Sequence, residues 1–389
     1  MENKKTPIVI AAYNRANSLD RLLKSLSNAI YPSNDIDLII SIDYANNNSD
    51  VLTIAEAFDW AFGDKKVMYQ PYNLGLRKHI IQCVSLCNTY GSIILLEDDL
   101  FLSPHFYAFS QQALNFCDDK DYISGISLYN HQYHQSSQNN FSPIEDGYDN
   151  WYLQYAFSSG IAINKAQWNS FLIWYKENEV LRHTSTVPKN VTQWSDKSWL
   201  KYYIHYLVQT NKFFFYPKIS LTCNFNDAGT HILKDSTLFQ VPLSQSVFNI
   251  KYFFSEITDS SAIYDVYFEN TQLNKALNLA MEDVVIDLYG IKPINQSSRY
   301  MLTDRILPYK IIKSFGRFLK PHDANILNNV IGSDFFLYDL QKKADGPPKP
   351  SDYAKIMYKV KQISRREAAI VWIQLFKEAL HRKLKILGL

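Results

Sequence analysis

Glycine is scarce in this chain of 389 residues, which has 12 glycines against 23 phenylalanines and 27 tyrosines. Neither of the common glycine-rich phosphate loops occurs, since the sequence contains no Gly-X-Gly-X-X-Gly and no Walker A motif. The chain is therefore neither an ordinary dinucleotide-binding protein nor a P-loop NTPase. Hydrophobic residues make up 47% of the sequence, so a sizeable core can form.

Cysteine and long hydrophobic runs are also rare. The 4 cysteines show no metal-ligand spacing, so we expect reduced thiols in a cytoplasmic setting. No uncharged apolar run reaches the roughly 18 residues of a membrane-spanning helix. Residues 1–6 lead straight into a strand-like run, so we expect no signal peptide. We expect no nucleic acid partner.

Most of the chain has no excess of positive charge, and the excess lies at its carboxyl-terminal end. The net charge is +2 overall, but residues 301–389 carry 17 Lys and Arg against 8 Asp and Glu. Two basic amphipathic helices are expected there, at residues 307–320 and 370–387, with a proline-rich linker at 346–350. Such helices are typical of contact with anionic membranes. Packing on the rest of the chain or on a partner subunit is the alternative.

Strands and helices alternate through the first hundred residues. Apolar strands are expected at residues 7–12, 37–42, 66–70 and 92–97, and Ser18 is expected to cap the first helix. This alternation predicts the α/β class, with a mostly parallel sheet and helices on both faces. Right-handed crossovers bring the carboxyl ends of such strands to one edge, where polar residues from separate strands meet.

Three acidic residues, Glu97, Asp98 and Asp99, directly follow the apolar run 93–96. We expect a strand buried on both faces that delivers these carboxylates to the edge of the sheet. Since adjacent carboxylates repel one another, a hard divalent cation such as Mg²⁺ or Mn²⁺ is the expected partner, together with phosphates. An acidic turn without a ligand is the alternative. The Ser-Pro pair at 103–104 is expected to cap and open the next helix.

These motifs resemble those of GT-A-fold nucleotide-sugar glycosyltransferases. The likeness is greatest to the N-acetylglucosaminyltransferase I type, which carries Glu-Asp-Asp, and to bacterial surface-polysaccharide glycosyltransferases. The matching segments are residues 9–15 and 40–43 (the nucleotide-binding strands), 95–100 (the acidic motif), 194–199 (the stretch with the catalytic base) and 215–231 (the closing strand and histidine loop). The resemblance covers about residues 5–235. It implies a GT-A, Rossmann-like catalytic domain over residues 1–300, followed by a basic helical extension over 301–389.

The resemblance also implies roles for individual residues. Asp99 would be the direct ligand of Mn²⁺ or Mg²⁺. Asp196, in a helix expected to begin at Trp194 with Ser195 as its cap, would be the catalytic base of a single, inverting displacement. The donor-binding candidates are Arg15, Asp43, Arg77, Lys78, Glu97, Asp98 and His231.

Two departures from the family pattern stand out. The base region reads Trp-Ser-Asp-Lys-Ser-Trp and holds one acid only. The amino-terminal membrane anchor of the Golgi enzymes is missing from this sequence. The second departure suggests a bacterial relative that extends a surface glycan on the cytoplasmic side, peripherally attached to the inner face of the plasma membrane. Its donor would be a UDP-sugar or another nucleotide sugar, and its acceptor a glycan or lipid-linked oligosaccharide.

Alternatives stay open for the roles of single residues and for the function of the chain. Arg15 and Asp196 also suit helix caps, Asp43 suits a turn, and His231 suits a loop anchor. A nucleotidyltransferase also uses a carboxylate at a sheet edge and Mg²⁺, but normally needs a glycine-rich loop that residues 11–15 lack. An inactive scaffold that binds a glycan or a nucleotide is the other alternative.

Overall fold

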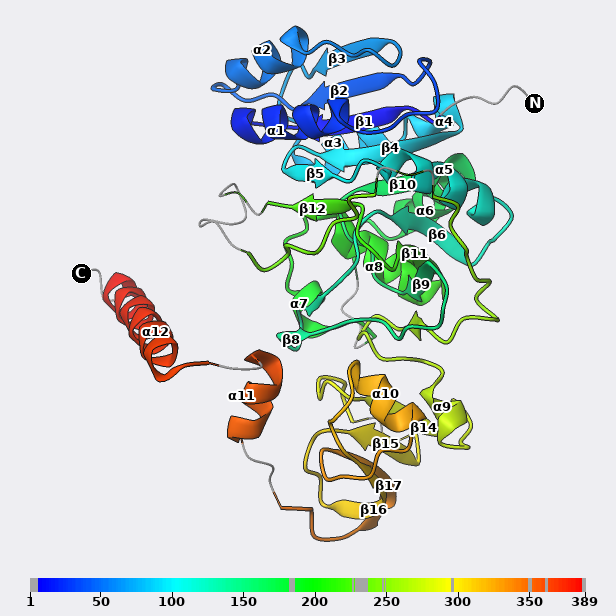
Figure 1. Ribbon diagram of the computed structural model, residues 1–389, viewed down its shortest axis with the longest axis vertical. Helices are drawn as coiled ribbons and strands as arrows, with labels where there is room; N and C mark the ends of the chain where they lie inside the picture. The colour runs from blue at the N-terminus through cyan, green and yellow to red at the C-terminus, as the bar shows by residue number, and fades with distance from the viewer. Residues whose placement is uncertain are drawn as a thin grey trace.

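A nine-stranded mixed sheet forms the centre of the molecule (Figure 1). The computed structural model describes residues 6–181, 186–225, 227, 237–246, 248, 250–294, 297–348, 352–360 and 363–386. The strand order is β13-β9-β11-β6-β10-β4-β1-β2-β3. These strands are β1 (Ile8–Ala12), β2 (Leu38–Ile42), β3 (Lys65–Tyr69), β4 (Ser92–Glu97), β6 (Ile123–Ser127), β9 (Asn150–Leu153), β10 (Ile161–Asn164), β11 (Phe213–Pro217) and β13 (Ile263–Tyr264).

The first four of these strands are parallel neighbours, as their alternation with helices predicts. β10 then runs antiparallel between β4 and β6. β11 is parallel to β6 and antiparallel to β9. The expected α/β class with a mostly parallel sheet is confirmed.

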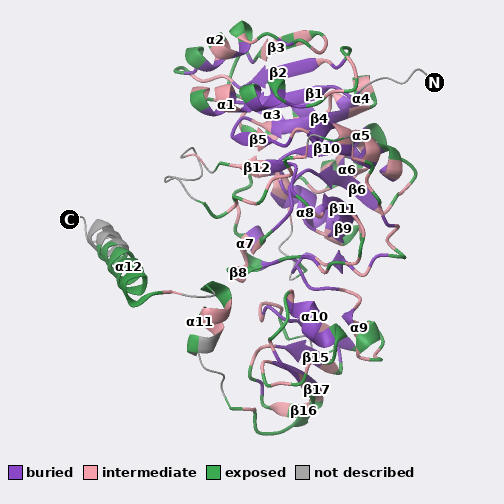
Figure 2. Cartoon of the chain, viewed as in Figure 1, coloured by how far each residue is buried: buried purple, intermediate pink, exposed green. Residues whose placement is uncertain are grey.

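Two layers of helices cover the sheet. One face carries α1 (Ala16–Ser27), α2 (Ser49–Ala57) and α5 (Phe106–Cys117). The other carries α3 (Leu76–Val84), α4 (Cys87–Tyr90), α6 (Lys165–Glu177) and α8 (Trp199–Gln209), and α7 (Lys189–Thr192) lies nearby. All residues of β1 and β2, and the central four of β4, are buried (Figure 2). A strand that is apolar on both faces gains burial from both layers, so its position is strongly determined.

A second, four-stranded sheet follows in the order β14-β15-β17-β16. Its strands are β14 (Val284–Asp287), β15 (Tyr300–Thr303), β16 (Tyr309–Phe315) and β17 (Phe335–Lys343), with the short helices α9 (Leu273–Ala276) and α10 (His322–Leu327) beside it. This sheet lies on both sides of position 300 in the sequence, so the part beyond 301 is not purely helical.

The expectation of a helix over residues 307–320 is wrong, because β16 occupies residues 309–315. Tyr309 and Ile311 pack into a small core with Tyr338, whereas Lys310 and Lys313 are exposed. Pairing with β17 along the sheet edge overrides the helical spacing. Exposed lysines on an edge strand also discourage pairing with other chains.

Three expected helix starts are also corrected. α1 begins at Ala16, so Ser18 lies inside it. α5 begins at Phe106, because residues 100–102 first form β5 (Leu100–Leu102), which pairs with β12 (Thr222–Asn224). α8 begins at Trp199, because residues 195–198 form a turn closed by the Ser198 amide on the Ser195 carbonyl at 2.9 Å.

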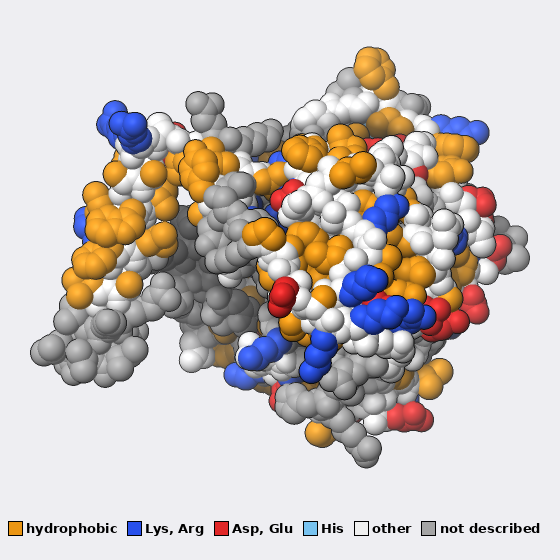
Figure 3. All heavy atoms as spheres, turned by 90° about the horizontal axis from the view of Figure 1, so that it is seen from below, with side chains coloured by type: hydrophobic (Ala, Val, Ile, Leu, Met, Phe, Trp, Pro, Cys, Tyr) orange, Lys and Arg blue, Asp and Glu red, His pale blue; other side chains and the backbone are white. Residues whose placement is uncertain are grey.

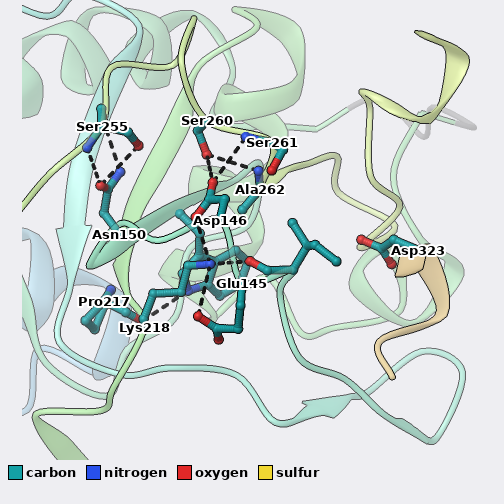
Figure 4. A network of polar contacts seen from close by, with 12 residues as sticks. Glu145, Asp146, Asn150, Pro217, Lys218, Ser255, Ser260, Ser261, Ala262 and Asp323 are labelled. Atoms are coloured by element: carbon teal, nitrogen blue, oxygen red, sulfur yellow. Dashed lines mark hydrogen bonds and ion pairs between the residues drawn. The ribbon is translucent and has the colours of Figure 1, made fainter. Parts of the chain in front are cut away.

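A buried polar network fastens the chain leading to the second sheet onto the first (Figure 4). The ammonium group of Lys218, just after β11, pairs with Asp146 at 3.1 Å. The other oxygen of Asp146 accepts hydrogen bonds from the Ser260 hydroxyl and the Ser261 amide. Asn150 accepts from the Ser255 amide at 2.7 Å. These contacts stabilise the irregular segment that leads into β13.

The last two helices are α11 (Asp352–Val360) and α12 (Arg365–Ile386), so the helix expected over residues 370–387 is confirmed for the described residues. α11 packs on the rest of the chain, where Tyr358 stacks on His322 and Lys355 pairs with Asp304 at 3.3 Å. α12 extends away from the body (Figure 1). Within the described ranges, no helix has the length and apolar character needed to cross a bilayer.

Buried histidines make the fold sensitive to acid. His131 lies among the rings of Tyr129, Phe157, Tyr216 and Phe268. Burial lowers the pKa of His131 from its ordinary value of 6.5 to about 3. The unfolded chain therefore takes up a proton near pH 6.5 that the folded chain binds only near pH 3, and acid favours unfolding between these values.

We predict that His131→Phe weakens this acid sensitivity. In the wild-type protein, protonation of His131 in the unfolded chain should lower the free energy of unfolding by about 2 kcal/mol between pH 7 and pH 5. The free energy of unfolding of the variant should fall by about 2 kcal/mol less over the same pH interval. Urea unfolding at the two pH values measures both decreases. Parallel losses in both proteins would show that His131 titrates normally in the folded chain.

Candidate active site at the carboxyl edge of the sheet

The acidic run lies where expected, at the carboxyl end of β4. Glu97 is the last residue of the strand and pairs in register with Ala11 of β1. Asp98 and Asp99 form the turn into β5, and they are only 2% and 7% exposed. Since β4 lies in the middle of the sheet, these carboxylates are held on a rigid support.

Arg15 lies directly against two of these acids. Its Nη1 donates to Asp99 Oδ2 at 2.8 Å, and its Nη2 pairs with Asp98 Oδ1. The backbone amide of Tyr13 donates to the other oxygen of Asp98 at 3.2 Å. The ends of β1 and β4 are therefore joined through charge, as the predicted common edge requires.

Burial and mutual repulsion dominate the electrostatics of the acidic run. Burial raises the pKa of Asp98 to about 6, although Arg15 opposes this rise. Burial and the charge of Asp99 raise the pKa of Glu97 to about 8. Burial acts to lower the pKa of Arg15, but the charges of Asp98 and Asp99 outweigh it and raise that pKa. The cluster thus has more negative charge than Arg15 alone can neutralise.

Asp43 follows β2 at the same edge and is buried. Its carboxylate accepts hydrogen bonds from the backbone amides of Leu74 at 2.8 Å and Gly75 at 2.9 Å, just before α3. Asn48 links the neighbouring loops, since its side-chain amide donates to the carbonyl groups of Tyr13 at 2.7 Å and Asp43 at 2.8 Å. Asp43 therefore shapes the edge whether or not it also contacts a ligand.

Arg77 and Lys78 lie in the first turn of α3. The Arg77 guanidinium lies 4.8 Å from the ring centre of Tyr202 on α8, and its buried Nη1 has no hydrogen-bond partner within the described ranges. Lys78 is exposed. Within the described part of the chain, neither residue pairs with an acid of the acidic run, whose ion pairs are made by Arg15.

Asp196 lies in the turn before α8. Its side chain is 78% exposed and pairs with Lys201 at 2.7 Å. α8 begins on the same side as α3, because Tyr202 in its first turns contacts Arg77 in the first turn of α3. Since α3 follows the carboxyl end of β3, Asp196 also lies on the carboxyl side of the sheet. His231, the remaining candidate, lies outside the described residues.

The residues that follow β12 were missed in the sequence. The Phe225 amide donates to the Asp99 carbonyl at 3.1 Å, and its ring lies under the Arg21 guanidinium at 3.9 Å. Asp227 accepts from Ser18 at 2.7 Å and pairs with Arg21. Burial acts to raise the pKa of Asp227, but hydrogen bonds from Arg21 and Ser18 and the charges of Arg21 and Arg15 outweigh burial and lower that pKa. Phe225 and Asp227 lie within residues 215–231, the segment expected from the sequence to close the site, but no role was predicted for either residue.

Asp99 offers a place for a divalent ion. One of its oxygens, Oδ1, is buried without a hydrogen-bond partner in the described part of the chain. No group of three or more His, Cys, Asp and Glu side chains suited to a metal occurs among those same residues. An ion held by one or two carboxylates, with water and substrate phosphates as its other ligands, matches the usual coordination of Mg²⁺. The residues present therefore fit a metal that binds together with a phosphorylated substrate.

One known family matches the first part of the chain. Residues 8–166 match the sequence model described as glycosyl transferase family 2, so the resemblance of this part to nucleotide-sugar glycosyltransferases is confirmed. The matched region holds β1, β2 and the acidic run. No curated protein matches the chain at a significant level of similarity.

Several solved glycosyltransferases are distantly similar in structure. They include S. aureus TarS 1–349 in complex with UDP-GlcNAc (13% identity, TM-score 0.36, covering 58% of this chain and 60% of that one). Others are GalNAc-T7 with UDP, GalNAc and Mn²⁺ (12%, 0.35, 56% and 43%) and the mannosyltransferase PcManGT from Pyrobaculum calidifontis with GDP-Man and Mn²⁺ (7%, 0.30, 42% and 46%). The chain matches less than two thirds of the length of each.

Asn48→Ala should destabilise the protein by about 2 to 3 kcal/mol, because the buried carbonyl group of Asp43 and the half-buried one of Tyr13 lose their partner. Urea unfolding of the variant measures this loss. Asn47→Ala is the matched control, since Asn47 is exposed in the same turn and its replacement should change stability by less than about 0.5 kcal/mol. Similar losses in both variants would mean that the loops do not depend on Asn48.

Proposed function

We propose that this chain is a metal-dependent, inverting glycosyltransferase that uses a nucleotide sugar, with a UDP-sugar as the first candidate. The observation that supports this most is the buried acidic run at the end of β4, which lies inside the region that matches family 2. Asp99 Oδ1, which has no hydrogen-bond partner among the described residues, and the adjacent Arg15 provide one acceptor and one cation for a metal diphosphate.

The donor would lie along the carboxyl edge. A divalent ion on Asp99 supplies a Lewis acid that neutralises the leaving diphosphate when it is bound. Arg15 contacts Asp99, so it could exchange its hydrogen bond to this carboxylate for one to an oxygen of a phosphate bound at Asp99. Glu97 and Asp98 would accept hydrogen bonds from ribose or sugar hydroxyls. Asp43, through the Leu74–Gly75 backbone that it holds, would position the wall around the nucleoside.

Asp196 is the proposed general base. Its exposure leaves it accessible to an acceptor hydroxyl, and Lys201 holds the carboxylate in place. A base that removes the acceptor proton on the face opposite the diphosphate gives one displacement, with inversion at the anomeric carbon. The glycan extended in this way would belong to a surface polysaccharide such as an O-antigen or capsule.

An inactive scaffold is the alternative that one observation favours. The carboxylates of Asp98 and Asp99 accept three hydrogen bonds from residues near the end of β1, one from the Tyr13 amide and two from Arg15, which pairs with both acids. Such pairing also suits acids with a purely structural role. Binding and turnover measurements separate the two functions.

Asp99→Asn should abolish metal-dependent nucleotide binding. With wild-type protein, one nucleotide among UDP, GDP, CMP and dTDP, at 100-fold excess over Kd with Mn²⁺, should raise the unfolding free energy by about 2.7 kcal/mol. Thermal unfolding measures this gain, which the variant should lose. Asp64→Asn, at an exposed position, is the control and should keep it. Stabilisation by none of the four nucleotides would contradict the proposal.

Asp196→Asn should separate binding from catalysis. The variant should bind the nucleotide with unchanged affinity but lose transfer by about 10²- to 10⁴-fold, since it lacks the proton acceptor. Release of the nucleoside diphosphate from the nucleotide sugar measures turnover. Wild-type turnover in the variant would remove Asp196 as the base, and absence of turnover in wild type with intact binding would favour the scaffold.

The proposal includes attachment of α12 to an anionic membrane surface. Trp372, Ile373, Phe376 and Leu380 are exposed on one side of the helix, and hydrophobic side chains cover much of its visible face (Figure 3). The surrounding sequence is rich in lysine and arginine. Phe376→Glu should weaken sedimentation with anionic vesicles about tenfold, more than Gln374→Glu with the same change of charge. Equal binding of both variants would contradict this attachment.

A further inference from the structure

A cavity lies in the carboxyl-terminal part of the chain. Its volume is about 460 Å³, and its walls come from residues 265–274, β14 and the residues that follow Asp287. β14 is an edge strand of the four-stranded sheet, and among the described residues no further strand pairs with its outer side. None of the acidic-run residues lines this cavity. The volume is within the range of small-molecule sites.

Lys292 and Asp265 form a charged pair in the wall. The ammonium group of Lys292 contacts Asp265 Oδ2 and lies 5.5 Å from the ring centre of Tyr267. The other oxygen of Asp265 accepts from the backbone amides of Tyr267 at 2.8 Å and Glu269 at 3.1 Å. Asp265 is thereby fixed, while the ammonium group, which has three donors, has hydrogens left for another acceptor.

Glu269 is the feature that most clearly points to a ligand. The residue is only 1% exposed and lines the cavity. Its Oε1 accepts from the Tyr289 amide at 2.9 Å, but its Oε2 is buried without a partner in the described part of the chain. A buried polar atom of this kind costs stability unless water or a ligand completes its hydrogen bonding. Burial also raises the pKa of Glu269, which favours a neutral carboxyl group that can donate.

The chemistry of the walls selects a neutral ligand rich in hydroxyl groups. With Glu269 neutral, the carboxylates of Asp265 and Glu282 still outnumber the cation Lys292 among the described wall residues, so a phosphate or carboxylate would be disfavoured. Asn274 and Ser298 add polar groups to the wall. Hydroxyl groups can accept from Lys292 and also donate to amide oxygens, and Tyr267 offers an apolar ring edge.

We propose that this cavity binds a neutral sugar residue, at a site separate from the acidic edge of the large sheet. The binding itself does not depend on any transfer activity. Its role, to hold a sugar unit of the acceptor glycan away from the reacting end, rests on the proposed function.

Saturation-transfer NMR on the full chain tests the site with glucose, galactose, mannose and N-acetylglucosamine, each at about 10 mM to detect millimolar affinity. Asn274→Trp places an indole in the wall of the cavity and should reduce the signal of the bound sugar at least about fivefold. Lys275→Trp is the matched control, because Lys275 is exposed on the same short helix and does not line the cavity; it should leave the signal unchanged. If Asn274→Trp fails to fold, Thr271→Trp replaces it, with Gln272→Trp as its control.

A combined set of outcomes separates this site from the donor site. The sugar signal should persist in Asp99→Asn, even if nucleotide binding and transfer prove absent. No signal with any of the four sugars, equal signals in Asn274→Trp and wild type, or loss of signal in Asp99→Asn would each overturn the proposal. The last result would place the sugar at the acidic edge instead.

Discussion

The contact of one guanidinium group with two carboxylates is the interaction on which the carboxyl edge depends. Arg15 comes from the loop after β1, and Asp98 and Asp99 come from the turn after β4. Without this cation, the buried acids would lie beside one another uncompensated, a situation that typically costs several kcal/mol. The Tyr13 and Phe225 amides then attach the neighbouring loops to the same two acids. The geometry of the whole edge therefore follows from how these charges are neutralised.

Much of this edge could be predicted from local patterns. Apolar runs that end in polar residues identified β1, β2 and β4, and the crossover rule placed Arg15, Asp43 and the acids together. The pattern failed where distant segments decide the structure. The contact between Ser18 and Asp227 joins residues 209 positions apart, and β5 exists only because β12 pairs with it. The strand β16 likewise depends on β17, which no local spacing reveals.

Several independent contacts connect the carboxyl-terminal part of the chain to the residues around the nine-stranded sheet. β13 pairs with β9 at the edge of the large sheet, and Asp323 of α10 accepts from Tyr264 of β13. The ring of His134 lies against Phe268, which follows β13, and against Tyr289, which follows β14. Lys359 of α11 contributes its carbonyl to Asn140. A ligand that alters the second sheet would therefore act on residues that also pack against the first.

The position of Arg15 has a consequence for the order of binding. Its guanidinium acts as an internal counter-ion that competes with any external cation for Asp99. A metal ion alone must overcome this competition, whereas a diphosphate gives Arg15 a new anionic partner and frees the carboxylate. The two ligands should therefore bind with positive cooperativity, and by linkage each strengthens the other to the same extent. The proposed enzyme would therefore admit a metal ion chiefly as part of a nucleotide complex.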